Sequence, residues 1–313
     1  MEKIIGLDIG GTKILGAVYD GQGNIVLREK KKTKAHEGLE VVMEQVYKVL
    51  DALIEGSKEG VKSIGVGVPG LVDYEGKVAF SPNIPFDDYP LKEEIQRRYK
   101  VPVIVGNDVN VAMFGEYKKT NNPSLHNVLG LFVGTGVGGA AIINGTLYLG
   151  QGSAGEFGHM VVNSEGAYCG CGAQGCLEAY SSKTAIHSYI QSQLGKGRKS
   201  VLKDLLSEDG AVIKSSSIRK AYDLGDALAI ESIKRCGKYL GIAVGSLINI
   251  FQPQMIIFGG GIFEAFGDEL LNITISEATL HAMPGIINHV EFKLSELGDD
   301  AGIYGAYKLA QSL

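Results

Sequence analysis

The chain of 313 residues contains no tryptophan, only eight prolines and only four cysteines. So few prolines, together with glycines that follow no three-residue repeat, exclude a collagen-like protein. No apolar run reaches the length needed to cross a membrane, and the start Met1-Glu2-Lys3 lacks the long apolar segment and the cleavage site of a signal peptide. We therefore expect a cytoplasmic protein whose thiols stay reduced.

Positive charge is scarce as well. Thirty Lys and Arg residues face 35 Asp and Glu residues, which gives a net charge of −5 and a poor match to a nucleic-acid backbone. The one basic run, Lys30 to Lys34, is interpreted as a solvated strand end. We expect neither a nucleic acid nor a membrane as partner. The length is typical of one large domain or two ordinary ones.

Glycine, in contrast, is abundant and unevenly distributed. The chain has 44 glycines, and fourteen of them lie between Gly130 and Gly175. Since glycine lacks a Cβ atom, such clusters mark places where the backbone makes tight turns or approaches another group closely.

Two segments repeat one order of elements. In residues 3–32 and again in residues 127–149, the pattern predicts a strand, a glycine turn, a second strand, a hairpin and a third strand. Further helices are predicted at 39–54, 91–99, 226–250 and 300–313, and further strands at 63–68, 101–105 and 255–258. The repetition, roughly 126 residues apart, is typical of a duplicated two-lobed α/β fold whose first strands form an antiparallel meander.

Two segments match the dinucleotide-binding motif Gly-x-Gly-x-x-Gly, namely residues 65–70 and 134–139. That motif requires a helix directly after the loop. Neither segment precedes one, so we reject a Rossmann fold, and the sequence also contains no P-loop motif.

A glycine turn between antiparallel strands can still hold phosphate, because its backbone N–H groups approach the oxygens closely. Thr12 and Thr135 add hydroxyl donors, Lys13 adds charge, and Asp8 is placed to hold a Mg²⁺-bound water. Two tight hairpins are the alternative, but matching turns in a duplicated pattern favour nucleotide binding. Gly259-Gly260-Gly261 fits either an adenosine contact or a plain strand-to-helix junction.

The cysteines suggest a metal site. His159 precedes Cys169 by ten residues, and Cys169, Cys171 and Cys176 form a Cys-x-Cys-x₄-Cys run. One imidazole and three thiolates make a complete tetrahedral structural Zn²⁺ site. Disulfides or free thiols are the alternatives. Because a closed site leaves no open position, we expect the metal to shape a loop, while Cys236 is expected to be a buried thiol.

The candidate base is Asp108, which follows Asn107 at the end of a predicted strand. Asp108 alone could be a helix N-cap, but a nucleotide-binding protein needs a carboxylate to deprotonate an acceptor hydroxyl. Asn83, Glu156 and Glu178 also stand near strand ends or glycine turns and could bind sugar hydroxyls.

These segments together resemble the ROK family, a group of bacterial sugar kinases and sugar-responsive repressors with the hexokinase/actin-like ATPase fold. The resemblance spans essentially the whole chain. It rests on Asp8-Ile9-Gly10-Gly11-Thr12-Lys13, Asn107-Asp108, Gly134-Thr135-Gly136-Val137-Gly138-Gly139, Glu156-Phe157-Gly158-His159, the Cys169-Cys171-Cys176 run and Leu177-Glu178. It implies an α/β fold of the duplicated two-lobed actin-like ATPase (ribonuclease H-like) type with a central cleft. We place the small lobe at residues 1–116 and 301–313 and the large lobe, with the zinc loop, at 117–300.

The resemblance also implies roles for residues. Asp108 would take the proton of the sugar 6-hydroxyl, and Asp8 would assist Mg²⁺. Phosphates would lie at Gly10, Gly11, Thr12, Lys13, Gly134, Thr135, Gly136, Gly138 and Gly139, and adenosine at Gly259, Gly260 and Gly261. Sugar would contact Asn83, Asn107, Asp108, Glu156, His159 and Glu178, and Zn²⁺ would bind His159, Cys169, Cys171 and Cys176.

We therefore predict an ATP-dependent hexose kinase with Mg²⁺ and structural Zn²⁺, a glucokinase that forms a homo-oligomer (dimer or tetramer). The alternatives are a kinase for N-acetylmannosamine, N-acetylglucosamine, mannose or fructose, or a sugar-sensing regulator without catalysis; polyphosphate is an alternative donor to ATP. The family's repressors carry a helix-turn-helix before the first strand, where this sequence has two residues, so the repressor branch is disfavoured.

Overall fold

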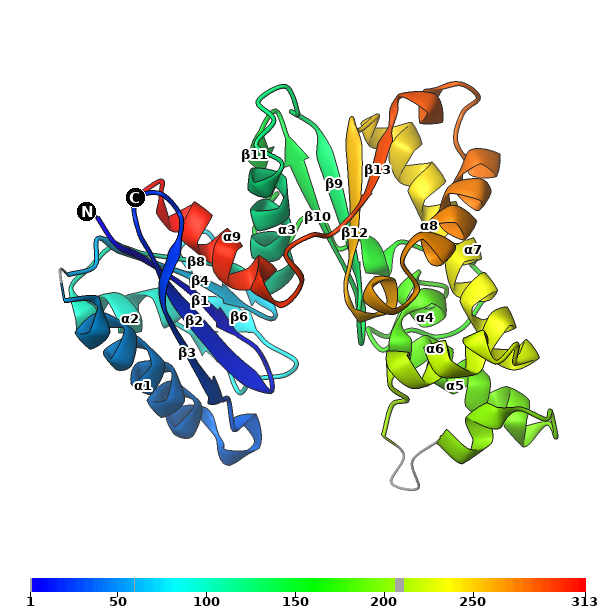
Figure 1. Ribbon diagram of the computed structural model, residues 1–313, viewed down its shortest axis with the longest axis horizontal. Coiled ribbons are helices and arrows are strands. Elements are labelled where there is room, and N and C mark those ends of the chain that lie inside the picture. The colour runs from blue at the N-terminus through cyan, green and yellow to red at the C-terminus, as the bar shows by residue number, and fades with distance from the viewer. Residues whose placement is uncertain (1, 59, 206–210) are drawn as a thin grey trace. The chain divides into compact units, whose positions relative to one another are not determined.

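The computed structural model describes residues 2–58, 60–205 and 211–313. The chain divides into two compact units (Figure 1). Unit 1 comprises Met1–Ser124, Thr146–Gly155 and Glu296–Leu313, and unit 2 comprises Leu125–Gly145 and Glu156–Ser295.

Unit 1 is built on a five-stranded sheet of order β3-β2-β1-β4-β8. β1, β2 and β3 pair antiparallel, whereas β4 and β8 continue the sheet parallel to β1. The bounds are β1 Ile4–Ile9, β2 Lys13–Tyr19, β3 Ile25–Lys32, β4 Ser63–Val68 and β8 Val103–Asn107. The apolar faces of these strands are covered by α1 (Leu39–Ser57), α2 (Leu91–Tyr99), α3 (Asp108–Lys119) and α9 (Ala301–Ala310).

Unit 2 repeats this sheet, with order β11-β10-β9-β12-β13. Again three antiparallel strands are extended by two parallel ones. The bounds are β9 Val128–Val133, β10 Val137–Ile143, β11 Thr146–Leu147, β12 Met255–Gly259 and β13 Glu291–Leu294, although β11 falls in unit 1. The predicted duplicated α/β fold with an antiparallel meander is confirmed.

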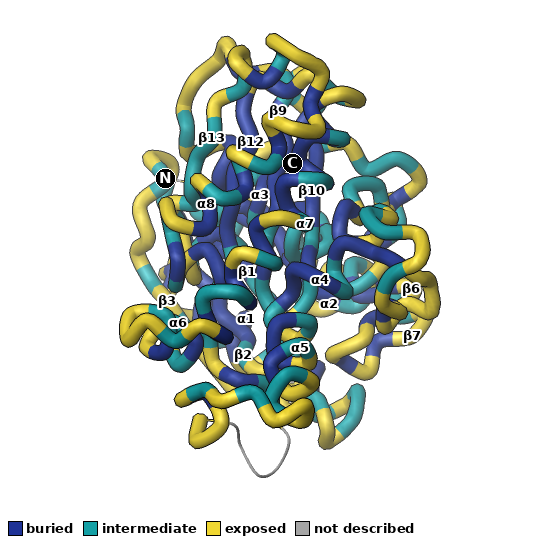
Figure 2. Tube along the Cα trace, turned by 90° about the vertical axis from the view of Figure 1, so that its right-hand side faces the viewer, coloured by how far each residue is buried: buried dark blue, intermediate teal, exposed yellow. Residues whose placement is uncertain are grey.

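The helices of unit 2 are α4 (Glu178–Ser181), α5 (Lys183–Gly195), α6 (Ser215–Asp223), α7 (Ala227–Phe251) and α8 (Gly261–His281). The long helix α7 buries a continuous apolar stripe, as its sequence pattern predicts, and Figure 2 shows much of it in dark blue. Cys236 lies in this stripe, fully buried, with its thiol donating to the Ser181 carbonyl. The prediction of a buried thiol is confirmed.

A small sheet of order β5-β6-β7 was not predicted. Its strands Leu71–Val72, Val78–Phe80 and Asp87–Tyr89 contain only two or three residues each. The motif at 65–70 thus runs from β4 into β5 and not into a helix, which confirms that it does not bind a dinucleotide in the Rossmann manner.

The C-terminal helix α9 packs backbone to backbone against its neighbours in unit 1, and Figure 1 shows it in red beside the blue strands. A Cβ atom on Gly6 of β1 would lie 2.0 Å from the Ile303 carbonyl oxygen, and one on Gly65 of β4 would lie 1.9 Å from that of Ala306. Any larger residue at either glycine would push the helix off the sheet.

Among the described residues, no helix is both long and apolar enough to cross a membrane.

Candidate functional site

The first glycine turn joins β1 to β2. The Gly10 N–H donates to the Lys13 carbonyl over 2.9 Å and closes the turn, while the Thr33 N–H at the end of β3 donates to the Thr12 carbonyl. Asn83 lies against this turn, because a Cβ atom on Gly11 would be 3.0 Å from the Asn83 Cβ. The fold of unit 1 therefore places a predicted sugar-binding residue beside a predicted phosphate turn.

Asp8 lies at the end of β1, partly buried against the first turn of α9. A Cβ atom on Gly302 would lie 2.8 Å from the Asp8 carboxyl carbon. Burial, followed by the nearby charge of Asp108, raises the pKa of Asp8 from 3.8 to about 7, although Lys13 acts in the opposite direction. The Asp8 carboxylate thus has too little positive charge near it, and a bound divalent cation would supply that charge.

Lys13 forms an ion pair with an acidic residue that is distant in the sequence. Its Nζ lies 2.8 Å from the Asp299 carboxylate, and this ammonium group lowers the pKa of Asp299. Sequence reasoning missed Asp299, since it is 286 residues away from Lys13 and stands in the short turn before α9.

At the end of β8 the structure decides which residue caps α3. The cap is Asn107, whose side-chain oxygen accepts hydrogen bonds from the N–H groups of Val109 and Asn110 and whose amide donates to the Gly70 carbonyl. Asp108 is the first residue of the helix, and its Oδ1 accepts from the Val109 N–H over 2.9 Å. The plain N-cap interpretation of Asp108 is therefore wrong, because its neighbour takes that role.

The second glycine turn is shorter than predicted. Only Gly134, Thr135 and Gly136 lie between the strands, because β10 begins at Val137. Gly138 and Gly139 are paired with β9 in the ladder. The turn is closed by a bond from the Gly134 N–H to the Gly136 carbonyl and is braced by the Thr184 hydroxyl, which donates to the Thr135 carbonyl.

Glu178 joins this turn to the cysteine-rich loop. One carboxylate oxygen accepts the Val137 N–H over 2.8 Å, and the other lies 3.7 Å from the Cys169 sulfur. A Cβ atom on Gly136 would lie 2.4 Å from the Glu178 carboxylate, so the glycine is what allows the carboxylate to approach.

The third glycine segment ends β12 and begins α8. Gly260 has φ +85° and caps the helix, and a Cβ atom there would lie 2.7 Å from the Val133 carbonyl oxygen. The segment is thus the predicted strand-to-helix junction, and its contact with adenosine stays a prediction.

His159, Cys169, Cys171 and Cys176 come together. Their ligand atoms all lie within 4.8 Å of one another, and the sulfurs of Cys171 and Cys176 are 3.8 Å apart. Tetrahedral Zn²⁺ with Zn–S bonds of about 2.3 Å separates two sulfurs by about 3.8 Å, whereas a disulfide requires about 2.05 Å. All four cysteines are free thiols. The donor set and its spacing fit zinc.

The backbone around this cluster depends on glycine. Gly172 and Gly175 have φ values of +91° and +85°, and a Cβ atom on Gly175 would lie 2.0 Å from the Asn163 carbonyl oxygen. The backbone N–H of Ala173 lowers the pKa of the exposed Cys171 thiol, which favours the thiolate that a metal binds.

The same loop gathers the acidic residues predicted to bind sugar. His159 Nδ1 faces Cys169 at 3.8 Å, while its Nε2 lies 4.0 Å from the Glu156 carboxylate. Burial raises the pKa of Glu156, and the charge of Glu178 acts in the same direction. In unit 2, therefore, Glu156, His159 and Glu178 adjoin one another and the cysteine cluster.

Known proteins resemble this chain over most of its length. The model of the ROK family matches residues 4–312. The glucokinase of Halalkalibacterium halodurans is 35% identical over 307 residues, which are 96% of this chain and 92% of that protein. The xylose repressor of Bacillus subtilis is 30% identical, but the match covers only 75% of its length.

A solved structure is similar over its whole length. It is the ROK family glucokinase from Streptomyces griseus in complex with glucose and AMPPNP, which is 33% identical and superposes with a TM-score of 0.82, covering 99% of this chain and 100% of that one. The fold is thus that of the actin-like ATPases, as predicted.

Proposed function

The chain belongs to the ROK family, and from this premise we propose that it is an ATP-dependent hexose kinase, a glucokinase that phosphorylates the 6-hydroxyl of glucose. The glucokinases from Halalkalibacterium halodurans and Streptomyces griseus support glucose as acceptor, and the AMPPNP bound to the latter supports ATP as donor.

One observation within unit 1 carries the proposal. Asp108 stands close enough to Asp8 for its charge to raise the Asp8 pKa, and Asp8 directly precedes the first glycine turn. A candidate base, a candidate metal-binding carboxylate and a phosphate turn therefore occupy one edge of one sheet.

The chemistry follows from these roles. The Asp108 carboxylate accepts the proton of the 6-hydroxyl as that oxygen bonds to the γ-phosphorus, and the bond to the ADP oxygen breaks. N–H groups of the turns at Gly10 and Gly134 and the hydroxyls of Thr12 and Thr135 stabilise charge on the phosphates. Mg²⁺, when bound near Asp8, supplies charge neutralisation that the buried carboxylate lacks.

The remaining assignments are part of the proposal. Asn83, Asn107, Glu156, His159 and Glu178 bind sugar hydroxyls. Zn²⁺ held by His159, Cys169, Cys171 and Cys176 is structural and fixes the loop that carries the acidic residues. Asn107 uses one amide hydrogen for the Gly70 carbonyl, so any sugar contact from its nitrogen uses the other.

The test is an ADP-release assay over a panel of hexoses and amino sugars, with Asp108→Ala compared to the wild type. We expect glucose to be the best acceptor and kcat to fall by about 10²- to 10⁴-fold in the variant, while glucose still binds in calorimetry. Asp51→Asn is the matched control, because Asp51 lies on α1 and its carboxylate pairs with Arg98 and Tyr99 of α2, outside the proposed site. Near wild-type turnover in Asp108→Ala would remove Asp108 as the base.

A further inference from the structure

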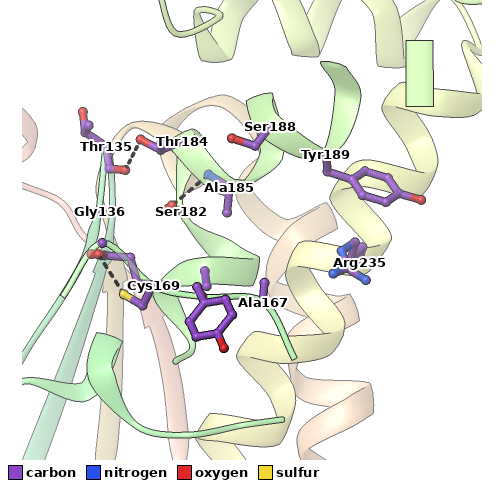
Figure 3. Close-up of a pocket in the computed structure, with 14 residues that line it drawn as sticks. Thr135, Gly136, Ala167, Cys169, Ser182, Thr184, Ala185, Ser188, Tyr189 and Arg235 are labelled. Atoms are coloured by element: carbon purple, nitrogen blue, oxygen red, sulfur yellow. Dashed lines mark hydrogen bonds between the residues drawn. The ribbon is translucent and has the colours of Figure 1, made fainter. Parts of the chain in front are cut away.

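A cavity lies within unit 2, lined by Cys169 and Glu178 and by residues of α5 and α7. The cavity has a volume of about 560 Å³, within the range of small-molecule sites. Figure 3 shows it enclosed by the second glycine turn, the cysteine-rich loop, the start of α5 and the side chain of Arg235 on α7.

Arg235 is the cation of this cavity. Its guanidinium carbon lies 5.0 Å from the ring centroids of Tyr180, Tyr189 and Tyr239, so three aromatic faces hold it in place. Within the part of the chain that the structure describes, it has no hydrogen-bond acceptor and no carboxylate within 4.0 Å. A half-buried arginine that is held in place and whose five N–H groups have no acceptor among the described residues can bind an oxyanion through two parallel hydrogen bonds.

The opposite wall is rich in hydroxyl groups. Ser182, Thr184 and Ser188 line the cavity from the N-terminal part of α5. The positive end of the α5 dipole lies on the same wall, which adds to the attraction for an anion near it. Tyr168, with 77% of its surface exposed, forms part of the rim.

We propose that this cavity binds a small phosphorylated polyol, with the phosphate on Arg235 and the hydroxyl groups along the α5 wall. A phosphate dianion matches the arginine fork. The Ser188 hydroxyl can donate to or accept from a polyol, Ser182, whose Oγ accepts the Ala185 N–H, can still donate, and Thr184, whose proton goes to the Thr135 carbonyl, can still accept.

The cavity is connected to the zinc loop. Tyr180, which stacks on Tyr239 at 3.9 Å beneath Arg235, accepts a hydrogen bond from the Ala167 N–H over 2.6 Å, two residues before Cys169. Tyr180 therefore links the tyrosines around Arg235 to the loop that carries the cysteines.

The experiment is isothermal titration calorimetry on the full chain, with glucose 6-phosphate and, separately, inorganic phosphate, at saturating glucose. The choice of glucose 6-phosphate and of saturating glucose rests on the proposed function. We expect one glucose 6-phosphate to bind per chain even when glucose fills the sugar site, and inorganic phosphate to bind at least tenfold more weakly. Equal binding of both would overturn the polyol part of the proposal.

Three variants locate the binding. Arg235→Met keeps the apolar stem and is expected to weaken glucose 6-phosphate binding at least tenfold, whereas Lys234→Met, the adjacent exposed cation on the same helix, leaves it unchanged. Ser188→Phe fills the cavity from the α5 wall and serves as the second test if Arg235→Met does not fold. The cavity would be excluded as the binding site if glucose displaced glucose 6-phosphate and neither Arg235→Met nor Ser188→Phe weakened its binding. If glucose itself does not bind, the proposed function is wrong. The cavity can still be tested in that case, because the dependence of glucose 6-phosphate binding on Arg235 can be measured without glucose.

Discussion

Asp8→Asn is expected to stabilise the nucleotide-free protein, and to do so more at high pH. The wild-type carboxyl has a pKa of about 7 in the folded state against 3.8 for the free group, chiefly because burial disfavours its charge. Between these two values the unfolded chain is ionised while the folded chain keeps its proton. Wild-type stability is therefore lost as pH rises toward 7 and is not regained above it.

The magnitude follows from the two pKa values. At about 1.36 kcal/mol for each pKa unit, the raised pKa of Asp8 lowers the free energy of unfolding by roughly 2 kcal/mol at pH 5.5 and roughly 4 kcal/mol at pH 8. Asparagine, which stays neutral, avoids this cost. The advantage of Asp8→Asn should thus grow by about 2 kcal/mol between these two pH values.

Urea unfolding of the wild type and the variant at pH 5.5 and pH 8, without nucleotide or added Mg²⁺, measures this difference. Asp20→Asn is the control, because backbone N–H groups led by that of Asn24 lower the pKa of the exposed Asp20, whose titration ends below pH 5.5. Its effect should be the same at both pH values. A constant or shrinking advantage for Asp8→Asn would refute the reasoning. On the proposed function, kinase activity should also fall in the same variant, because Asp8 is the carboxylate proposed to assist Mg²⁺.

Two further outcomes concern the cysteine-rich loop. Cys176→Ala should lose bound zinc, measured by plasma emission spectrometry on the purified protein, whereas Cys236→Ala should keep it; a folded wild type without zinc would exclude the metal site. Gly175→Ala should lower the melting temperature well beyond Gly197→Ala, because both glycines have φ near +85° but only at Gly175 would the new Cβ strike the Asn163 carbonyl. Equal losses in calorimetric scans would show that backbone conformation alone decides the cost.

Signals confined to a short stretch of chain were read correctly from the sequence. The strand Ser63–Val68 and the helix Leu91–Tyr99 have the predicted bounds, because their apolar period is complete within each segment. The cluster of His159 with three cysteines was equally visible, since its four residues span only 18 positions. The duplicated order of strands followed from the same local patterns.

Features that depend on strand pairing or on side chains brought together in space were not visible in the sequence. β10 begins at Val137, which pairs with Val133 of β9, whereas the glycines at 138 and 139 had predicted a longer turn. The strands of the sheet β5-β6-β7 are too short for a period to appear. Asp299 and Arg235 acquire their significance only from side chains that approach them in space.

The close packing of α9 against the glycines of β1 and β4 affects the order in which the two units can fold during synthesis. Synthesis proceeds from the N-terminus, so β1 to β8 leave the ribosome long before residues 301–310 exist. Unit 2, whose residues are all made by Ser295, can complete its core first. Unit 1 exposes the face of its sheet that carries Gly6 and Gly65 until α9 is made, and a deletion of α9 would leave that face uncovered.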